Sequence, residues 1–197
     1  RERLMALYRA RAEEELPGML SADVVRLLST FSLLKSDLGP ALADAVRAFL
    51  ADRARHIKVP DLAEALAAFA RLNLHPGEPL LAAFRARALV DADRLGPRAW
   101  SALLQGLAGL RESPGGNLMG ILRKHGVGLC PQMRAGDVCG AICALAVMRE
   151  APGDALLDAM KARCAEAAAD LAPEEVAGVL WGLASLGAPP GGELFDS

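Results

Sequence analysis

The chain has 197 residues, enough for one domain of ordinary size or for one stretch of a repeating structure. Hydrophobic residues make up 53% of it and aromatic residues only 4%, so alanine and leucine supply most of the apolar surface, as is typical of helical proteins. A net charge of −2 excludes a globally basic nucleic-acid binder, and the apolar content excludes a disordered chain.

Three features bear on the kind of protein to which the chain belongs. No segment approaches the roughly 18 uninterrupted apolar residues of a membrane-spanning helix, because charged residues recur every few positions. Cysteines are too few and too unevenly spaced for a disulfide framework, which favours a reducing interior; they are Cys130, Cys139, Cys143 and Cys164. The chain starts at Arg1 without an initiator methionine and stops in the middle of the pattern described below, so we expect a piece of a longer protein.

Apolar residues recur along the chain with a constant period of 38. The clearest column consists of Leu28, Leu66, Leu104, Ile142 and Leu180. Further columns with the same period start at Val24, Phe31, Leu34, Leu42 and Val46. In the first block of each unit the apolar residues fall at i, i+4, i+7 and i+10, which is one face of an α-helix.

Each unit is predicted to be a helical hairpin. In the first full unit one helix covers about residues 22–35 and the next about 40–50, and Leu38-Gly39 supplies the stop, turn and restart. The equivalent turns are Pro76-Gly77, Pro114-Gly115, Pro152-Gly153 and Pro190-Gly191. Residues 1–16 fit as the second helix of a preceding unit, and the last unit breaks off as its second helix starts. The predicted units are 1–20 (partial), 21–58, 59–96, 97–134, 135–172 and 173–197 (partial), in one array over 1–197.

The predicted fold class is therefore all-α, an α-solenoid of stacked helix-turn-helix hairpins. A single hairpin cannot bury its apolar stripe, so the units must stack side by side. Small residues in the first helices allow neighbouring helices to approach closely, and one such column is Thr30, Ala68, Gly106, Ala144 and Gly182. Acidic residues such as Asp23 and Asp61 stand in the first turns, where they complement the helix dipole.

The segment from Pro173 to Gly187 resembles the first helix of the octotricopeptide repeats, and of the related helical repeats found beside RAP domains. It reads Pro-Glu-Glu-Val-Ala-Gly-Val-Leu-Trp-Gly-Leu-Ala-Ser-Leu-Gly, similar to the Leu-Trp-Ala-Leu-Ala-x-Leu-Gly of those repeats, and the period of 38 is what the family name denotes. The period covers the whole chain, but the motif is sharp only in the last unit. The Trp181 column elsewhere holds Ser29, Ala67, Gln105 and Cys143, and no RAP-like segment is visible.

This resemblance implies an organellar RNA-binding protein. Members of the family bind RNA to stabilise, process or help translate organellar transcripts, and some are built into divergent organellar ribosomes. RNA as the partner and the mitochondrion as the location, with the chloroplast as the alternative, are implied by the resemblance alone.

Basic residues also form columns with the period of 38. The first column, on the second helices, consists of Arg9, Arg47, Arg85, Arg123 and Lys161. Two residues further on, a companion column interrupted by Phe49 contains Arg11, Arg87, His125 and Arg163. A third column, at the end of the first helices, contains Lys35, Arg111 and Arg149, with Asn73 between them. We expect stacking to bring them into lines along one edge, suited to successive RNA phosphates; the alternative is that they only complement helix dipoles.

Contacts to bases would come from the exposed stripe of the first helices. We expect this stripe to be Val25/Ser29/Leu33, Ala63/Ala67/Arg71, Ser101/Gln105/Gly109, Cys139/Cys143/Val147 and Ala177/Trp181/Ser185. Of these, Arg71, Ser101 and Gln105 can hydrogen-bond to a base, and Trp181 can stack on one. A stripe made mostly of small and apolar residues fits protein packing as well.

No catalytic residue, metal ligand or cofactor site is predicted. Cys139 and Cys143 lie four residues apart on one helix face, but no histidine or carboxylate cluster completes a zinc site, so we interpret them as half-buried core residues. His56 and His75 have no acid and nucleophile at a recognisable spacing, and Gly115-Gly116 is not followed by the Gly-Lys-Ser/Thr of a phosphate loop. We therefore expect a protein that is not an enzyme.

Two kinds of function remain open on the sequence. In the first, the chain binds RNA through its basic columns, as a lineage-specific component or helper of the organellar ribosome that holds ribosomal RNA among other proteins of a large assembly. In the second, it is a separate factor for the stability, processing or translation of a transcript, or a scaffold that contacts only proteins.

Overall fold

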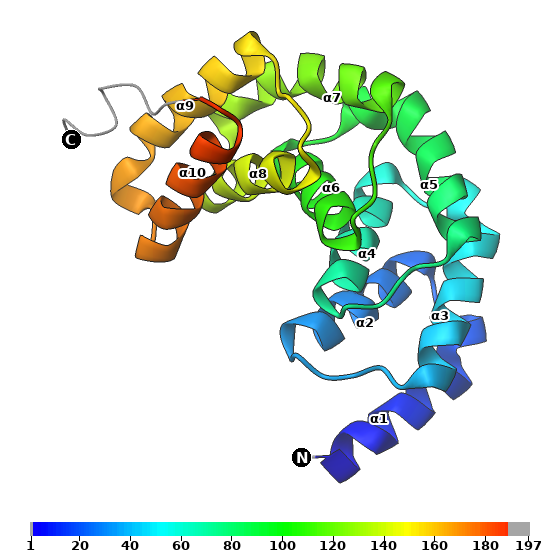
Figure 1. The fold of residues 1–197 in the computed structure, drawn as a ribbon. Coiled ribbons are helices and arrows are strands. Elements are labelled where there is room, and N and C mark those ends of the chain that lie inside the picture. The colour runs from blue at the N-terminus through cyan, green and yellow to red at the C-terminus, as the bar shows by residue number, and fades with distance from the viewer. Residues whose placement is uncertain (1, 189–197) are drawn as a thin grey trace.

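The computed structural model describes residues 2–188, which form ten α-helices and five single-turn 3₁₀-helices and contain no strand (Figure 1). The helices are α1 (Glu2–Glu15), α2 (Ser21–Leu33), α3 (Pro40–Arg53), α4 (Val59–Arg71), α5 (Glu78–Asp91), α6 (Pro97–Leu110), α7 (Gly116–Leu129), α8 (Ala135–Met148), α9 (Asp154–Glu166) and α10 (Pro173–Ser185). Successive first helices start one full period apart, so the predicted all-α repeat array is confirmed. The second helix expected after Pro190-Gly191 lies outside the described residues.

The helices form two curved layers (Figure 1). The even-numbered helices, α2 to α10, line the inside of the arc, and the odd-numbered helices follow its outside. Neighbouring inner helices are in much closer contact with one another than neighbouring outer helices are, and the array therefore curves toward the inner layer. Within the described residues no helix has the length and apolar character needed to cross a membrane.

Close approach of the inner helices depends on the predicted column of small residues. At Gly106 of α6, an added Cβ would lie 2.8 Å from the backbone nitrogen of Ala67 in α4. At Gly182 of α10 it would lie 2.6 Å from the side chain of Ile142 in α8. Backbone therefore packs almost directly on the neighbouring helix at these points, which only a residue without a side chain permits.

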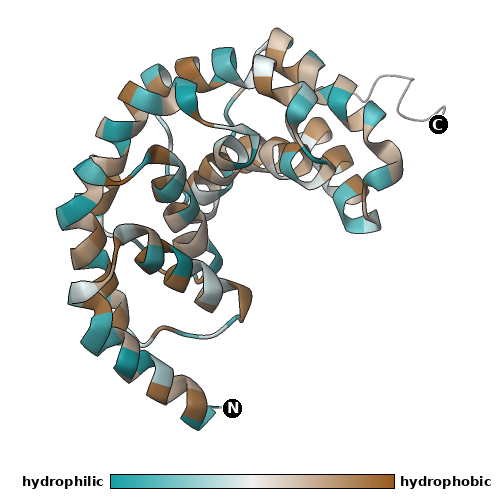
Figure 2. Cartoon of the chain, turned by 180° about the vertical axis from the view of Figure 1, so that it is seen from behind, coloured by the Kyte–Doolittle hydropathy of each residue, from teal (hydrophilic) through white to brown (hydrophobic). Residues whose placement is uncertain are grey.

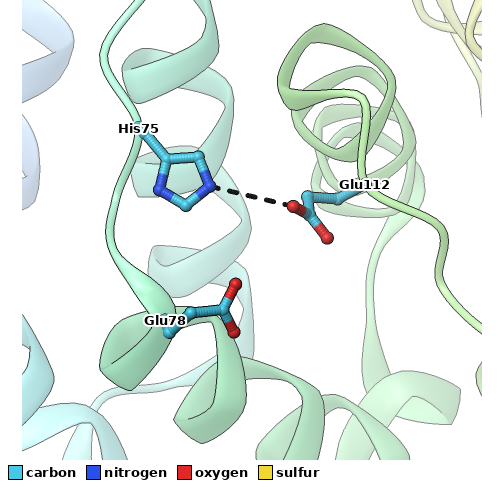
Figure 3. Close-up of side chains that lie close together, drawn as sticks. All are labelled: His75, Glu78 and Glu112. Carbon is cyan, nitrogen blue, oxygen red and sulfur yellow. Dashed lines mark ion pairs between the residues drawn. The ribbon is translucent and has the colours of Figure 1, made fainter.

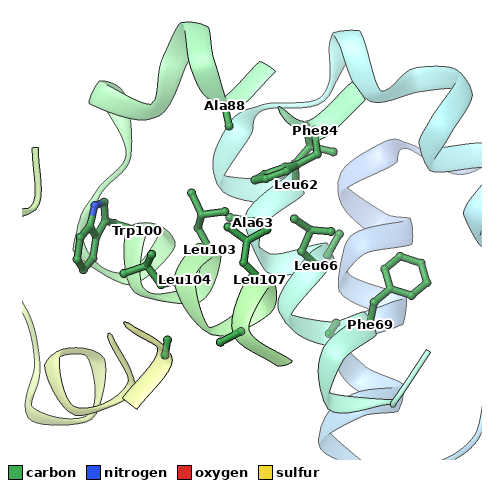
Figure 4. Packing of buried hydrophobic residues seen from close by; sticks show 14 of the residues in the cluster. Leu62, Ala63, Leu66, Phe69, Phe84, Ala88, Trp100, Leu103, Leu104 and Leu107 are labelled. Atoms are coloured by element: carbon green, nitrogen blue, oxygen red, sulfur yellow. The ribbon is translucent and has the colours of Figure 1, made fainter. Parts of the chain in front are cut away.

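The apolar columns meet between the two layers, as Figure 4 shows for Leu66, Phe84 and Leu107. Trp100 is fully buried there, and its Nε1–H donates a hydrogen bond to the carbonyl of Leu122 at 3.1 Å. Figure 2 shows that hydrophilic residues mark the outer helices along the arc, whereas α6 and α8 in the middle of the inner layer are mainly hydrophobic. The core is thus one continuous layer that runs through all the units.

The stop of the first helix differs from the prediction, whereas the restart of the second helix agrees with it. The first helix stops at a residue in the left-handed conformation, as at Arg111 with φ 59°, four residues before the glycine that was expected to stop it. Two backbone hydrogen bonds cap the end of this helix. The amide N–H of Arg111 donates to the carbonyl of Ala108 at 3.1 Å, and that of Glu112 donates to the carbonyl of Leu107 at 2.9 Å. The glycine directly precedes the second helix, as predicted, and at Gly115 its φ is 76°.

Single 3₁₀ turns join the units, and the sequence analysis did not predict them. They recur with the same period as the helices, at Leu16–Gly18, Ala54–His56, Ala92–Arg94, Cys130–Gln132 and Ala168–Asp170. Each follows an outer helix and leads into the next inner helix, at the end of the hairpin opposite to its turn. We call the side of the array with the hairpin turns (34–39, 72–77, 110–115 and 148–153) the turn edge, and the side with the 3₁₀ turns the linker edge.

A glycine-to-alanine pair tests the close approach of the inner helices. Gly106→Ala is expected to lower the free energy of unfolding by roughly 1–3 kcal/mol, because the added methyl group meets backbone of α4 that cannot move aside alone. Gly120→Ala, in α7 with nothing within 4 Å of its Cβ position, is the control and should leave stability unchanged or raise it by up to about 1 kcal/mol. Denaturant unfolding of both variants measures the difference, and equal stabilities would contradict the close approach.

Candidate nucleic-acid interface

The first basic column lies on the outer helices and reaches the turn of the next unit. Arginine Nε–H groups donate to backbone carbonyls 28 residues further on, at 2.7 Å in each case: Arg9 to Asp37, Arg47 to His75 and Arg123 to Ala151. Arg85 reaches the equivalent turn through an ion pair with Glu112 instead. Lys161 continues the column on α9 and is partly buried. These arginines therefore fasten each unit to the next.

Acidic residues compensate much of the charge of this column. Glu150 lies 3.5 Å from the guanidinium of Arg123, and Asp44 lies 2.6 Å from that of Arg47. The arginine side chains are about one-third exposed, with 29% for Arg47 and 36% for Arg123. Backbone carbonyls and carboxylates already occupy several of their N–H donors, which leaves fewer donors for RNA phosphates. The main contribution of the column is therefore to the packing between units.

The companion column reaches the linker edge, contrary to the expectation that the basic columns share one edge. His125 Nε2 contacts the carbonyl of Leu95 at 2.7 Å, and Arg163 Nε–H donates to the carbonyl of Met133 at 2.7 Å, in each case 30 residues earlier. Both carbonyls directly follow a 3₁₀ turn. The other two members pair within their own helical segments, Arg87 with Asp91 and Arg11 with Glu14 and Glu15.

The third column lies at the turn edge and is exposed. Its members Lys35, Arg111 and Arg149 occupy the left-handed position that ends an inner helix, with φ of 48°, 59° and 56°. Their side chains make no hydrogen bond or ion pair with any other described residue. Two members of the same column are residues that adopt this conformation readily, Asn73 and Gly187.

Three of the four candidate base contacts lie in seams between inner helices. Ser101 is fully buried, and its hydroxyl donates to the carbonyl of Asp137 at 2.7 Å, so it does not reach the surface. Gln105 is exposed but donates to Ser101 Oγ at 2.8 Å, and Arg71 pairs with Glu64 at 3.0 Å. Trp181, on α10, is 51% exposed.

The expected exposed stripe is corrected in the same way. Its first position is buried in four units, at Val25, Ala63, Ser101 and Cys139, because the next inner helix covers it. Only its last position is exposed in every unit, at Leu33, Arg71, Gly109, Val147 and Ser185. The close approach of the inner helices thus removes the first position of the stripe from the surface in these four units.

Two equivalent grooves open at the turn edge between successive inner helices. One lies between α6 and α8 and is lined by Arg111 and Val147, among others. The second lies one unit later, between α8 and α10, and is lined by Arg149 and Trp181. Each groove therefore combines apolar surface with a cation from the third column. Their common signal in the sequence is the spacing of the two arginines, which equals the period.

His75, Glu78 and Glu112 also meet at the turn edge, and their geometry is that of a possible metal site (Figure 3). However, His75 Nδ1 accepts the amide N–H of Gly77 at 3.0 Å, so in the neutral ring the proton lies on Nε2, 3.7 Å from Glu112. That nitrogen then has no lone pair for a metal, and Glu112 is held by Arg85.

The residues one period before and after His75 show that it has a structural role in the turn. Asp37 Oδ1 and Ser113 Oγ, one period before and after it, accept the amide N–H of the glycine two residues later in the same way, at 3.1 Å each. His75 is therefore one of three side chains that close equivalent turns.

Comparison with models of protein families finds no match to the chain, and a search of curated proteins finds no similar sequence. The resemblance to the octotricopeptide repeats therefore rests on the period of 38 and on the motif around Trp181.

Measurements of stability can test the hydrogen bonds that arginines such as Arg47 make to the turn of the next unit. Arg47→Met keeps the apolar stem but leaves the carbonyl of His75 without its donor, and should lower the free energy of unfolding by about 1 kcal/mol. Arg55→Met, an exposed site on the linker edge, is the control and should change it by less than about 0.5 kcal/mol. Denaturant unfolding and hydrogen exchange of residues 72–77 measure the effect; equal behaviour of the variants would show that the bond to His75 adds nothing.

Proposed function

We propose that the chain binds RNA along the turn edge, with Lys35, Arg111 and Arg149 as contacts to the phosphate backbone. One observation carries the proposal: three exposed cations, which have no partner among residues 2–188, recur at the same place in the repeat. Neighbouring packed helices lie about 8–10 Å apart, so cations of adjacent units such as Arg111 and Arg149 suit a polyanion that follows the edge.

The backbone conformation of these cations supports the proposal. The left-handed conformation costs a residue other than glycine or asparagine roughly 1–2 kcal/mol, whereas a cation at an exposed helix C-terminus recovers about 0.3–1 kcal/mol through the helix dipole. The local structure therefore does not fully account for lysine and arginine at a position where Gly187 is free of strain. Contact with an external anion supplies a reason to retain them.

The groove between α8 and α10 adds a feature suited to an unpaired base. Its lining brings an exposed indole, Trp181, together with the guanidinium of Arg149. A base can stack on the indole while its phosphate contacts the arginine. Among the residues singled out for base contact, Trp181 is the one whose surroundings favour this role.

In the cell, we place this activity in an organelle, with the mitochondrion ahead of the chloroplast, on the strength of the octotricopeptide resemblance. The proposed role is a component or helper of the organellar ribosome that holds ribosomal RNA, and a free transcript factor is the alternative. A scaffold that binds only proteins is the second candidate, favoured by exposed apolar side chains of the inner helices such as Leu33 and Val147, which are 77% and 53% exposed.

Glycine substitutions separate binding from stability at the turn edge. The triple variant Lys35→Gly, Arg111→Gly, Arg149→Gly should bind single-stranded RNA more weakly, and the salt dependence of its affinity should fall by about 0.7 per lost contact, or roughly two units. Its thermal midpoint should not fall, because glycine relieves the left-handed strain.

The matched control removes three exposed cations from the linker edge, with Arg55→Ala, Lys58→Ala and Arg134→Ala. Filter binding or fluorescence anisotropy over a range of salt concentrations gives the slopes. A control variant that loses as much affinity as the glycine variant would indicate that net charge, not the turn edge, determines binding.

Tryptophan fluorescence tests the base contact. A single-stranded RNA oligonucleotide should quench the exposed Trp181, while the buried Trp100 serves as an unchanged reference. Subtracting the spectrum of Trp181→Phe isolates the signal. An oligomer of the same length without bases should bind but not quench; quenching by both oligomers alike would contradict stacking.

A further inference from the structure

Two thiols of α8 face the same short segment of α10. Cys139 Sγ–H donates to the carbonyl of Glu175, and Cys143 Sγ–H donates to that of Gly178, both at 3.3 Å. A Cβ on Gly178 would lie 3.2 Å from each sulfur, so both sulfurs adjoin the same point of this glycine. The two cysteines thus form a pair on the side of α8 that faces α10, and they are not two separate core residues.

The preceding seam shows what this place requires of the structure. At the equivalent positions of the preceding unit stand Ser101 and Gln105, and Ser101 makes the bond to a carbonyl that Cys139 makes here. Gln105 contacts Ser101 at 2.8 Å as Cys143 adjoins Cys139. Serine and glutamine thus fill the equivalent place between α6 and α8 and make the hydrogen bond to the carbonyl there. The packing of the helices therefore does not require thiols, and the cysteine pair adds nucleophilic groups.

The pair also activates one of its members. The single proton of the Cys139 thiol can turn from the carbonyl of Glu175 to the sulfur of Cys143 when Cys143 ionises. This hydrogen bond lowers the pKa of Cys143 to about 7, although burial acts in the opposite direction. The pKa of Cys139 is raised, by its bond to Cys143 first, then by burial and by the nearby Glu175 and Cys164.

The other two cysteines provide a contrast within the same chain. Cys130 and Cys164 are fully buried, and burial raises their pKa values to about 11 and about 12. Cys143 is only partly buried. Access and ionisation therefore both favour reaction at Cys143.

We propose that Cys143 is a site of reversible thiol modification by a low-molecular-weight disulfide, with Cys139 as the residue that positions and stabilises its thiolate. The thiolate of Cys143 attacks one sulfur of the disulfide, a new sulfur–sulfur bond forms, and the other half leaves as a thiolate. Cys139 does not resolve the product, because side chains four apart on a helix have Cβ atoms about 5–6 Å apart and a disulfide needs about 3.5–4.5 Å. The adduct persists until an external thiol removes it.

The place of the adduct determines its effect on the fold. Modified Cys143 no longer donates to the carbonyl of Gly178, and its added bulk lies where α8 and α10 are closest, at Gly178 and Gly182. Within the described residues, α8 is the main packing partner of α10. Modification is therefore expected to loosen α10, which carries Trp181.

Incubation of the folded 197-residue chain with glutathione disulfide at pH 7, followed by peptide mass spectrometry, tests the site. Thiolate fraction and nucleophilicity together predict that Cys143 reacts roughly a hundredfold faster than Cys130 or Cys164. Equal rates at the three cysteines, or reaction only in denaturant, would overturn the proposal.

Two variants of Cys139 test its positioning role through the pH profile of this reaction. Cys139→Ala removes the donor and should move the midpoint for Cys143 upward from about 7, whereas Cys139→Ser keeps a donor, as Ser101 does, and should restore it. An unchanged midpoint in the alanine variant would exclude the role of Cys139. Hydrogen exchange should accelerate in residues 173–185 after modification, return to its initial rate with dithiothreitol and stay constant in Cys143→Ser; unchanged exchange would refute the loosening of α10.

Discussion

The close contact between neighbouring inner helices determines most of this structure. Where backbone packs on backbone, as at Gly106 against Ala67, the inner layer is shorter than the outer layer, and the array has to curve. The same contact buries one side of every inner helix, which decides which residues of the predicted stripe reach the surface. It also brings Cys139 and Cys143 within hydrogen-bond distance of the backbone of α10.

The outer helices cannot approach one another as closely, and long polar side chains bridge the wider spacing instead. The column that contains Arg47 connects each outer helix to the following turn, and the column that contains Arg163 connects it to the preceding linker. A column of cations in a repeat protein is thus explained in the first place by the backbone carbonyls that repeat with it. Lys35, Arg111 and Arg149, at the ends of the inner helices, have no such partner among the described residues.

The two proposals concern neighbouring parts of the same seam. Arg149 and Trp181 line the groove at the turn edge between α8 and α10, and Cys143 lies in the seam between these helices. A change in the packing of α10 would therefore reach Trp181 without any direct contact with a ligand. This arrangement follows from the one-dimensional character of a repeat array, in which each unit depends mainly on its neighbours.

The sequence by itself determined the all-α class, the period of 38, the two helices per unit and the small residues at the contacts, because each repeats in every unit at fixed spacing. It did not determine which basic column is free, since Arg47 and Arg111 have the same period and differ only in the partners that folding brings to them. Nor did it show that Cys139 and Cys143 face the backbone of α10 as Ser101 faces that of α8. Those facts depend on contacts between residues of successive units, which periodicity places in register but only tertiary packing brings together.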